Sequence, residues 1–207
     1  MKAVGILGGT FDPIHYGHLL AAEYARHEFA LEKILLIPAA RPPHKNLESV
    51  LDVDHRFKMA EIAVQDNPAM EISLLEKKRN GLSYTVDTVK HLLNAYFGAS
   101  LFFILGADSL LFMNSWKNIE ELATLCTFVV VTRPGYKINP QDREMAGLPD
   151  ILWKNARYLE IPGLDISSSD IRRRVAQGKP IKYLLPPEVE RYICEMGLYR
   201  GGGIDDR

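Results

Sequence analysis

The stretch GILGGTFDPIHYGHLLA, residues 5–21, decides the fold of this chain. The apolar run at residues 3–7 ends in Gly8 and Gly9, a pattern typical of a buried strand that stops at a turn. From Tyr16 onward, apolar side chains recur at roughly helical spacing. His15 and His18 stand between the two elements, so this strand-to-helix junction is the first candidate for a site.

The glycines of this junction favour the binding of an anion. At a turn from strand to helix, glycine lets backbone N–H groups approach an anion, and the positive end of the helix attracts it. Thr10 adds a hydroxyl donor. The P-loop pattern requires Lys and then Ser or Thr, whereas Phe11 and Asp12 follow here, and the glycines do not match Gly-x-Gly-x-x-Gly either. We therefore expect a phosphate loop of another kind.

The two histidines supply what the missing lysine would have supplied. His18 falls in the first helical turn and His15 lies three residues earlier, so both can point at the anion. Imidazole donors can bind phosphate oxygens that gain charge in a transition state. A metal pair, or one surface and one packed histidine, are the other interpretations. A zinc site normally needs a third protein ligand, and no Cys or Glu is suitably placed nearby, so we favour phosphate.

The composition is that of a globular protein with one large core. The chain has 207 residues, of which 47% are hydrophobic and 25% charged, and its formal net charge is -1. This balance argues against a surface that coats nucleic acid. Cys126 and Cys194 stand in apolar patterns and are interpreted as buried thiols. We find no leader pattern and no apolar run that approaches the length of a membrane span, and we expect a reducing cytoplasm.

Short buried strands alternate with helices along the chain, which predicts an α/β fold with a doubly wound, mainly parallel sheet flanked by helices. We expect one domain over residues 1–200 and a disordered tail at 201–207. Polar loops are expected at 76–83 and 135–150, and Glu76 to Arg79 are interpreted as solvated. The expected strands are 3–7, 33–37, 70–75, 100–106, 127–135 and 157–161, and the expected helices are 16–30, 84–97, 119–125, 165–178 and 186–197. A further helix is expected after Asp52 or Asp54, either of which can cap it, with Phe57, Ala60, Ile62 and Ala63 along it.

The loops that carry chemistry all follow strands. They are residues 8–18, 38–45, 106–116, 133–136 and 163–172. In parallel sheets, ligands bind beyond the carboxyl ends of the strands, where the strand order switches. We therefore expect these loops to form one site.

Two motifs make the chain resemble the nucleotidyltransferase superfamily. GTFDPIHYGH, residues 9–18, is similar to its G-x-F-x-P-x-H-x-G-H signature. ISSSDIR, residues 166–172, is similar to its second motif, a helix start rich in Ser or Thr followed by Arg. Both motifs are present in the expected order. The resemblance implies a Rossmann-like nucleotidyltransferase fold.

Further stretches resemble the bacterial nicotinate-nucleotide adenylyltransferases along nearly the whole chain. They are PPHK (42–45), SYTVDTV (83–89), GADSL (106–110), NSW (114–116), TRPGY (132–136) and YLLPPEVERYICEMGLY (183–199). The resemblance implies transfer of AMP from ATP to nicotinate mononucleotide, with pyrophosphate as the second product. It also implies that Mg²⁺ arrives on ATP and has no dedicated protein site.

The resemblance also implies a set of site residues. His15 and His18 are implied to stabilise the transition state. Several of the other residues also have a plain structural interpretation: Asp108, Thr85 and the serines as helix caps, Trp116 as core packing, and Arg172, His44 and Lys45 as solvated cations. The residues implied to bind ATP are Gly8, Gly9, Thr10, Phe11, Gly106, Asp108, Ser167, Ser169 and Arg172, and those implied to bind nicotinate mononucleotide are His44, Lys45, Tyr84, Thr85, Trp116 and Arg133.

Two alternative functions stay open. The same chemistry on nicotinamide mononucleotide or phosphopantetheine would change the acceptor and the ligand of Thr85 and Trp116. A nucleotide sensor without catalysis is the second alternative, although the intact motif residues disfavour it. The expected partners are small-molecule substrates, with neither nucleic acid nor membrane, and a homo-oligomer is possible.

Overall fold

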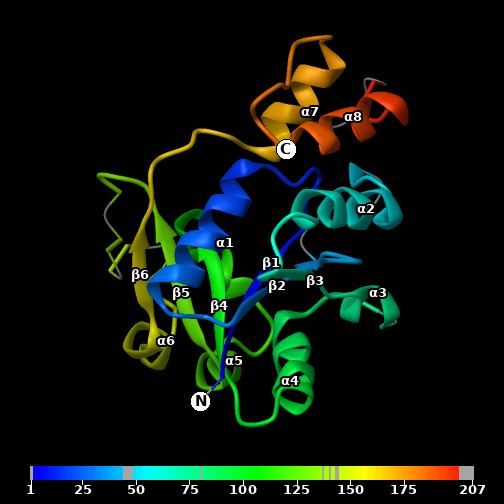
Figure 1. Ribbon diagram of the computed structural model, residues 1–207. Helices are drawn as coiled ribbons and strands as arrows, with labels where there is room; N and C mark the ends of the chain where they lie inside the picture. Colours follow the sequence, from blue (N-terminus) through cyan, green and yellow to red (C-terminus); the bar gives the residue numbers. More distant parts are fainter. Residues whose placement is uncertain are drawn as a thin grey trace.

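The core of the protein is a six-stranded parallel sheet (Figure 1). The computed structural model describes residues 2–43, 49–79, 81–136, 138–139, 141–142 and 145–200. The strands run in the order β3-β2-β1-β4-β5-β6. The order reverses between β1 and β4, which is the switch point where doubly wound sheets bind ligands. The strands are β1 (Ala3–Gly9), β2 (Lys33–Pro38), β3 (Met70–Ile72), β4 (Ser100–Gly106), β5 (Thr127–Thr132) and β6 (Arg157–Glu160).

Helices cover both faces of this sheet, as the near-continuous apolar strands require. Successive side chains of a strand alternate between two separate cores: Ile34 and Leu36 of β2 belong to one, and Leu35 and Ile37 to the other. The first core is closed by α1 (Tyr16–Glu28), α2 (Val53–Val64), α7 (Ser168–Ala176) and α8 (Pro187–Glu195). The second is closed by α4 (Thr85–Ala95), the 3-10 helix η2 (Ala107–Ser115), α5 (Ile119–Leu125) and α6 (Asp150–Asn155). The predicted α/β class and parallel sheet are confirmed.

Side-chain caps start two of the helices that hold the segment between β1 and α1, which Arg56 of α2 and Arg172 of α7 contact. Asp52 accepts a hydrogen bond from the backbone N–H of Asp54 at 2.8 Å and so begins α2. Ser167 accepts one from the N–H of Asp170 at 3.1 Å and so begins α7. In Figure 1, α7 and α8 lie beside each other, and α8 packs against α2. These caps therefore fix the helices that surround the carboxyl end of β1.

The structure corrects four expectations from the sequence. The predicted strand 70–75 ends at Ile72, and the predicted polar loop at 76–83 begins as the short helix α3 (Leu75–Lys78). Glu76 is buried rather than solvated, because it accepts a hydrogen bond from the Thr88 hydroxyl at 2.7 Å. Cys126 is buried as predicted, but Cys194 is exposed, since α8 turns Ile193 and not its neighbour into the core.

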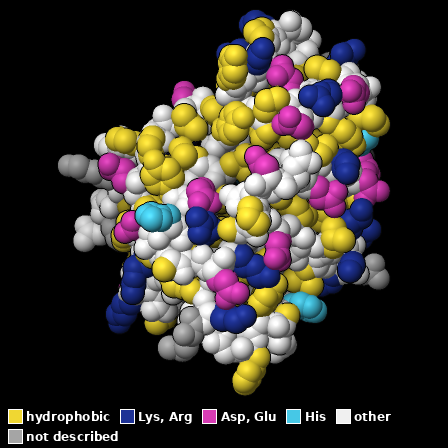
Figure 2. Space-filling view, viewed as in Figure 1, with side chains coloured by type: hydrophobic (Ala, Val, Ile, Leu, Met, Phe, Trp, Pro, Cys, Tyr) yellow, Lys and Arg dark blue, Asp and Glu magenta, His cyan; other side chains and the backbone are white. Residues whose placement is uncertain are grey.

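The outside of the protein carries charges of both signs. Figure 2 shows Lys and Arg side chains interspersed with Asp and Glu over the face seen in Figure 1. In the part of the chain that the structure describes, no helix is long and apolar enough to cross a membrane. The expectation of a disordered tail falls on residues 201–207, which lie outside the described residues.

We predict that Gly178→Ala destabilises the protein because of its backbone at the end of α7. Gly178 has a φ of 65°, and two hydrogen bonds close the helix there, from its N–H to Val175 O at 3.0 Å and from Lys179 N–H to Arg174 O at 2.8 Å. A Cβ meets no neighbouring atom, so the cost is conformational and about 1 kcal/mol. Urea unfolding measures it. Gly178→Asn should lose less, since Asn tolerates this conformation, and equal stability of Gly178→Ala and the wild type would contradict the prediction.

Candidate active site

The loop between β1 and α1 forms a tight turn around the buried ring of Phe11. Phe11 adopts a φ of 49° and is 1% exposed, and its ring meets the His18 ring edge-on at 5.0 Å between centroids. A Cβ on Gly9 would lie 3.0 Å from the Phe11 ring, and a Cβ on Gly17 would lie 3.0 Å from His15 Nδ1. These two positions therefore need glycine because an aromatic ring occupies the space of a side chain.

His15 and His18 form a stacked pair at the start of α1. Their ring centroids are 3.7 Å apart, with an angle of 26° between the planes. The backbone N–H of His15 donates to Nδ1 of His18 at 3.3 Å. Because Nδ1 accepts, the proton of neutral His18 resides on Nε2 and is available to a ligand.

Both histidines are neutral near pH 7. Burial lowers the pKa of His15 to about 4. Burial, together with the neighbouring His15, lowers the pKa of His18 well below its ordinary value. The pair therefore offers neutral hydrogen-bond donors rather than the fixed positive charge of a P-loop lysine.

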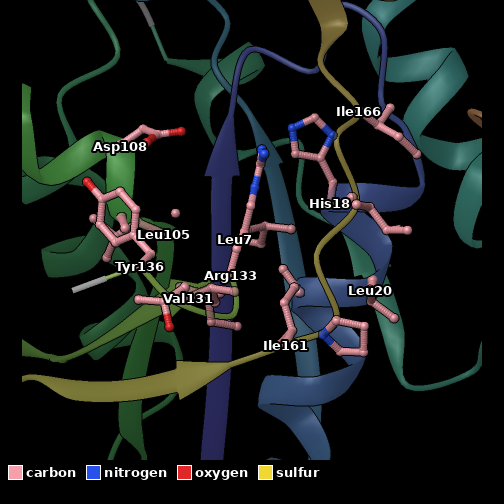
Figure 3. A pocket seen from close by; sticks show the side chains of 18 of the residues that line it. Leu7, His18, Leu20, Leu105, Asp108, Val131, Arg133, Tyr136, Ile161 and Ile166 are labelled. Carbon is pink, nitrogen blue, oxygen red and sulfur yellow. The ribbon is translucent and has the colours of Figure 1, made fainter. Parts of the chain in front are cut away.

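Two cavities open at the carboxyl ends of the strands and meet at His18. One cavity, of about 360 Å³, lies between α1 and the ends of β4, β5 and β6, and the other, of about 450 Å³, lies between β1, β2 and the start of α4. We call them the donor-side and the acceptor-side cavity, after the roles proposed for them under Proposed function. His18, Leu7, Leu105, Gly106 and Asp108 line both. Figure 3 shows the donor-side cavity, with His18 on α1 facing the segments that follow β4 and β5. A group held in one cavity can therefore react beside His18 with a group held in the other.

The acceptor-side cavity contains three residues of the expected nicotinate mononucleotide set. Tyr84, Thr85 and Trp116 line it, and the Trp116 ring is fixed by an edge contact with Phe103 at 5.8 Å. Gly8, Gly9 and Thr10, expected at ATP, line the same cavity. His44 and Lys45 lie outside the described residues.

Arg133 is separated from the other expected acceptor residues. It lines the donor-side cavity together with His15, and its Nη1 contacts Asp165 Oδ1 at 3.1 Å. In Figure 3 its side chain extends along β1 toward the end where His18 lies. The sequence places Arg133 directly after β5, but which cavity it faces depends on how the loop turns.

The second motif docks on the first through backbone contacts. The Ser168 hydroxyl donates to Pro13 O at 2.8 Å, and Arg172 Nη1 donates to Asp12 O at 2.9 Å. Ser169 accepts from Arg172 Nη2 at 3.2 Å, and Ser167 caps α7. The fold thus brings the two motifs together. Ser167, Ser169 and Arg172 do not line either of the two cavities, and Arg172 is buried rather than solvated.

Four polar residues of the site region escaped the sequence analysis. Glu76 lines the acceptor-side cavity. Asp12 is buried within the β1–α1 loop, and Arg56 and Tyr199 are buried beneath that loop. Of these four residues, only Asp12 lies in one of the two motifs, and the motif assigns it no role. Within the described ranges, no group of three or more His, Cys, Asp or Glu residues is arranged to hold a metal ion.

We predict that His15 makes the free energy of unfolding fall in acid. Its pKa is about 4 in the folded protein and about 6.5 when unfolded, so the unfolded chain binds more protons between these values. Above about pH 6.5, His15 does not reduce the free energy of unfolding. As the pH falls toward 4, up to about 3 kcal/mol of this free energy is lost. Urea unfolding near pH 7 and near pH 4.5 measures the loss. It should be clearly smaller in His15→Gln, and an equal loss in both proteins would refute this assignment.

Comparisons with known proteins agree with this geometry. The model of the cytidylyltransferase-like family matches residues 6–174. A probable nicotinate-nucleotide adenylyltransferase of Moorella thermoacetica is 48% identical over 95% of this chain and 91% of its own length, and one of Thermoanaerobacter sp. is 47% identical over 95% and 94%. Among solved structures, the Plasmodium falciparum nicotinic acid mononucleotide adenylyltransferase complexed with NaAD has a TM-score of 0.77 at 23% identity, over 96% of this chain and 98% of that one, which supports the fold. The chain belongs to the cytidylyltransferase-like family and, within it, to the nicotinate-nucleotide adenylyltransferases.

Proposed function

We propose that this enzyme transfers AMP from ATP to nicotinate mononucleotide and releases pyrophosphate. The observation that carries the proposal is the meeting of two cavities at His18 in a chain whose 48%-identical relative bears this activity in its name. A reaction that joins two nucleotides needs two binding spaces that share one reacting point. A sensor needs only one, so the geometry favours the transferase.

The reaction is an in-line displacement at the α-phosphorus of ATP. A phosphate oxygen of the mononucleotide forms the new bond, and the bond to the pyrophosphate oxygen breaks, with its electron pair leaving on pyrophosphate. The attacking phosphate is already ionised and needs no general base, so the protein has to align two anions and stabilise added charge. His18 Nε2–H, beside both cavities, is the proposed donor to that charge, and His15 stacks behind it.

The proposed places of the substrates follow from the lining of the cavities. The nicotinate ring stacks on Trp116 beside Tyr84 and Thr85 on the acceptor side. The adenosine part of ATP occupies the donor side, with Gly106 and Asp108 at the ribose. The backbone around Gly8, Gly9, Thr10 and Phe11 forms the proposed path of the phosphates, while the Phe11 side chain is buried and lines neither cavity.

The remaining expected contacts are also proposals. Ser167, Ser169 and Arg172 do not line the two cavities. Their proposed contact with the ATP phosphates therefore requires their side chains to move. Arg133, on the donor side, reaches the acceptor only near the point where the cavities meet. For His44 and Lys45 we propose contact with the mononucleotide phosphate.

We further propose that Mg²⁺ arrives on ATP and keeps most of its ligands from phosphate and water. We infer a cytoplasmic setting from the two free thiols and the absence, in the described chain, of a helix that could span a membrane. Neither nucleic acid nor membrane is a proposed partner, and a homo-oligomer is compatible with the proposal.

We predict that the enzyme prefers nicotinate mononucleotide as the acceptor. Pyrophosphate release from ATP and Mg²⁺ should be fast with nicotinate mononucleotide and much slower with nicotinamide mononucleotide or phosphopantetheine. A preference for another acceptor would keep the adenylyl transfer and change the ligand of Trp116 and Thr85. No turnover with any of the three, combined with tight ATP binding, would support the sensor instead.

We also predict that His18 is needed for turnover and not for folding. His18→Ala should fold normally and lose about 10²–10³ in kcat, the effect of removing one donor aimed at developing charge. His91→Ala is the matched control, since His91 is exposed on α4 and lines neither cavity, and it should keep the activity of the wild type. Circular dichroism and thermal unfolding check the fold of both variants. An unfolded His18→Ala would show that the ring is needed for packing.

A further inference from the structure

Arg56 is a buried cation with partners in three separate segments. It lies in the first turns of α2 and is 1% exposed. Its Nε donates to Leu51 O at 2.8 Å, Nη1 donates to Thr10 O at 2.8 Å and to Ala39 O at 2.7 Å, and Nη2 donates to Ala40 O at 3.3 Å. Burying a guanidinium is costly, and these four carbonyls, together with the nearby charge of Asp12, offset part of the cost.

Two of these segments form walls of the acceptor-side cavity. Thr10 continues β1 after the glycine pair, and Ala39 follows β2 and precedes Pro42 and Pro43. The Ala39 N–H also donates to Gly9 O at 2.8 Å. The single nitrogen Nη1 therefore bridges the ends of two neighbouring strands at the point where they give rise to the phosphate path and to the acceptor wall.

The same cation is linked to the loop that leads to His15. The Leu51 carbonyl accepts from Arg56, while the Leu51 N–H donates to Asp12 Oδ2 at 3.2 Å. Asp12 Oδ1 accepts from the Tyr199 hydroxyl at 2.6 Å. Burial and the Asp12 charge raise the pKa of Tyr199 far above its usual value, so this hydroxyl keeps its proton and remains a donor. The contacts form one connected network beneath the β1–α1 loop.

We propose that Arg56 is a positioning residue for adenylyl transfer, which sets the alignment of the two substrates by holding the Thr10 and Ala39 segments at a fixed spacing. This inference rests on the proposed function. Arg56 lines neither cavity, so it acts through the backbone that it holds and not by contact with a substrate. Misplacing two reactants by about 1 Å can cost about 10² in rate, even where each one still binds.

The test separates alignment from affinity. Arg56→Lys keeps the charge but cannot present the guanidinium fork to four carbonyls. We expect its kcat to fall about 10²-fold, while the Kd of ATP and the Kd of nicotinate mononucleotide, each measured alone by calorimetry, stay within about threefold of the wild type. Tyr199→Phe removes only the distant end of the network and should reduce kcat by about threefold to tenfold with unchanged Kd values.

Leu152→Ala is the control for general loss of stability. Leu152 is fully buried on α6, in the second core, and lines neither cavity. It should lower Tm as a large-to-small core substitution does, with kcat unchanged at a temperature well below Tm. If Arg56→Lys does not fold, Tyr199→Phe carries the same comparison.

Three results would overturn the inference. In the first, Arg56→Lys and Tyr199→Phe both have the kcat of the wild type. In the second, these variants change only the Kd of one substrate. In the third, Leu152→Ala loses as much kcat as Arg56→Lys does. These results leave the proposed function intact, because the wild type still turns over. A wild type without turnover on nicotinate mononucleotide would overturn the proposed function and this inference together.

Discussion

The stacking of His15 on His18 depends on how the chain leaves the sheet. Between the last glycine of β1 and the first turn of α1, the backbone turns around the buried Phe11 ring, and one ring edge then supports His18. Side chains at Gly9 or Gly17 would press on this arrangement. The two cavities, the docking of α7 and the network around Asp12 are all arranged around the loop that this turn creates.

A pair of neutral imidazoles is compatible with the proposed chemistry. Such a pair attracts the ground-state triphosphate less than a fixed cation would, so less of its interaction is spent on binding the substrate. A neutral donor contributes most where negative charge increases during the displacement. The burial that lowers the pKa values of His15 and His18 is therefore consistent with their proposed role.

Much of the architecture follows from the sequence, because buried parallel strands and strand-to-helix turns have strong local patterns. The positions of β1, β2, β4 and β5 and the start of α1 at the histidines were predicted. The sequence also predicted that loops after several strands meet, and residues after β1, β2, β4 and β5 line the two cavities, since parallel strands put their carboxyl ends on one edge. Short elements were missed: α3 and α6 span 4 and 6 residues, too few for a helical period to emerge.

The polar network was beyond the sequence for a different reason. Arg56 stands in a helix among charged neighbours, where an arginine is usually solvated, and its burial results from carbonyls supplied by Thr10, Ala39 and Leu51. Glu76 likewise stands in a charge run, and Thr88 of α4 donates to its Oε1. Such partners come together only when the tertiary fold forms, so neither composition nor spacing reveals them.

The bond between Tyr199 and Asp12 has a consequence for the order in which the protein matures. These residues are 187 positions apart, so the loop that carries the histidines gains this partner only after nearly the whole chain has been synthesised. The partners β1, β2 and β4 are all complete by Gly106, so this part of the sheet can pair long before Tyr199 is made. The last hydrogen bond to the loop therefore depends on the segment that follows α8, at the far end of the sequence.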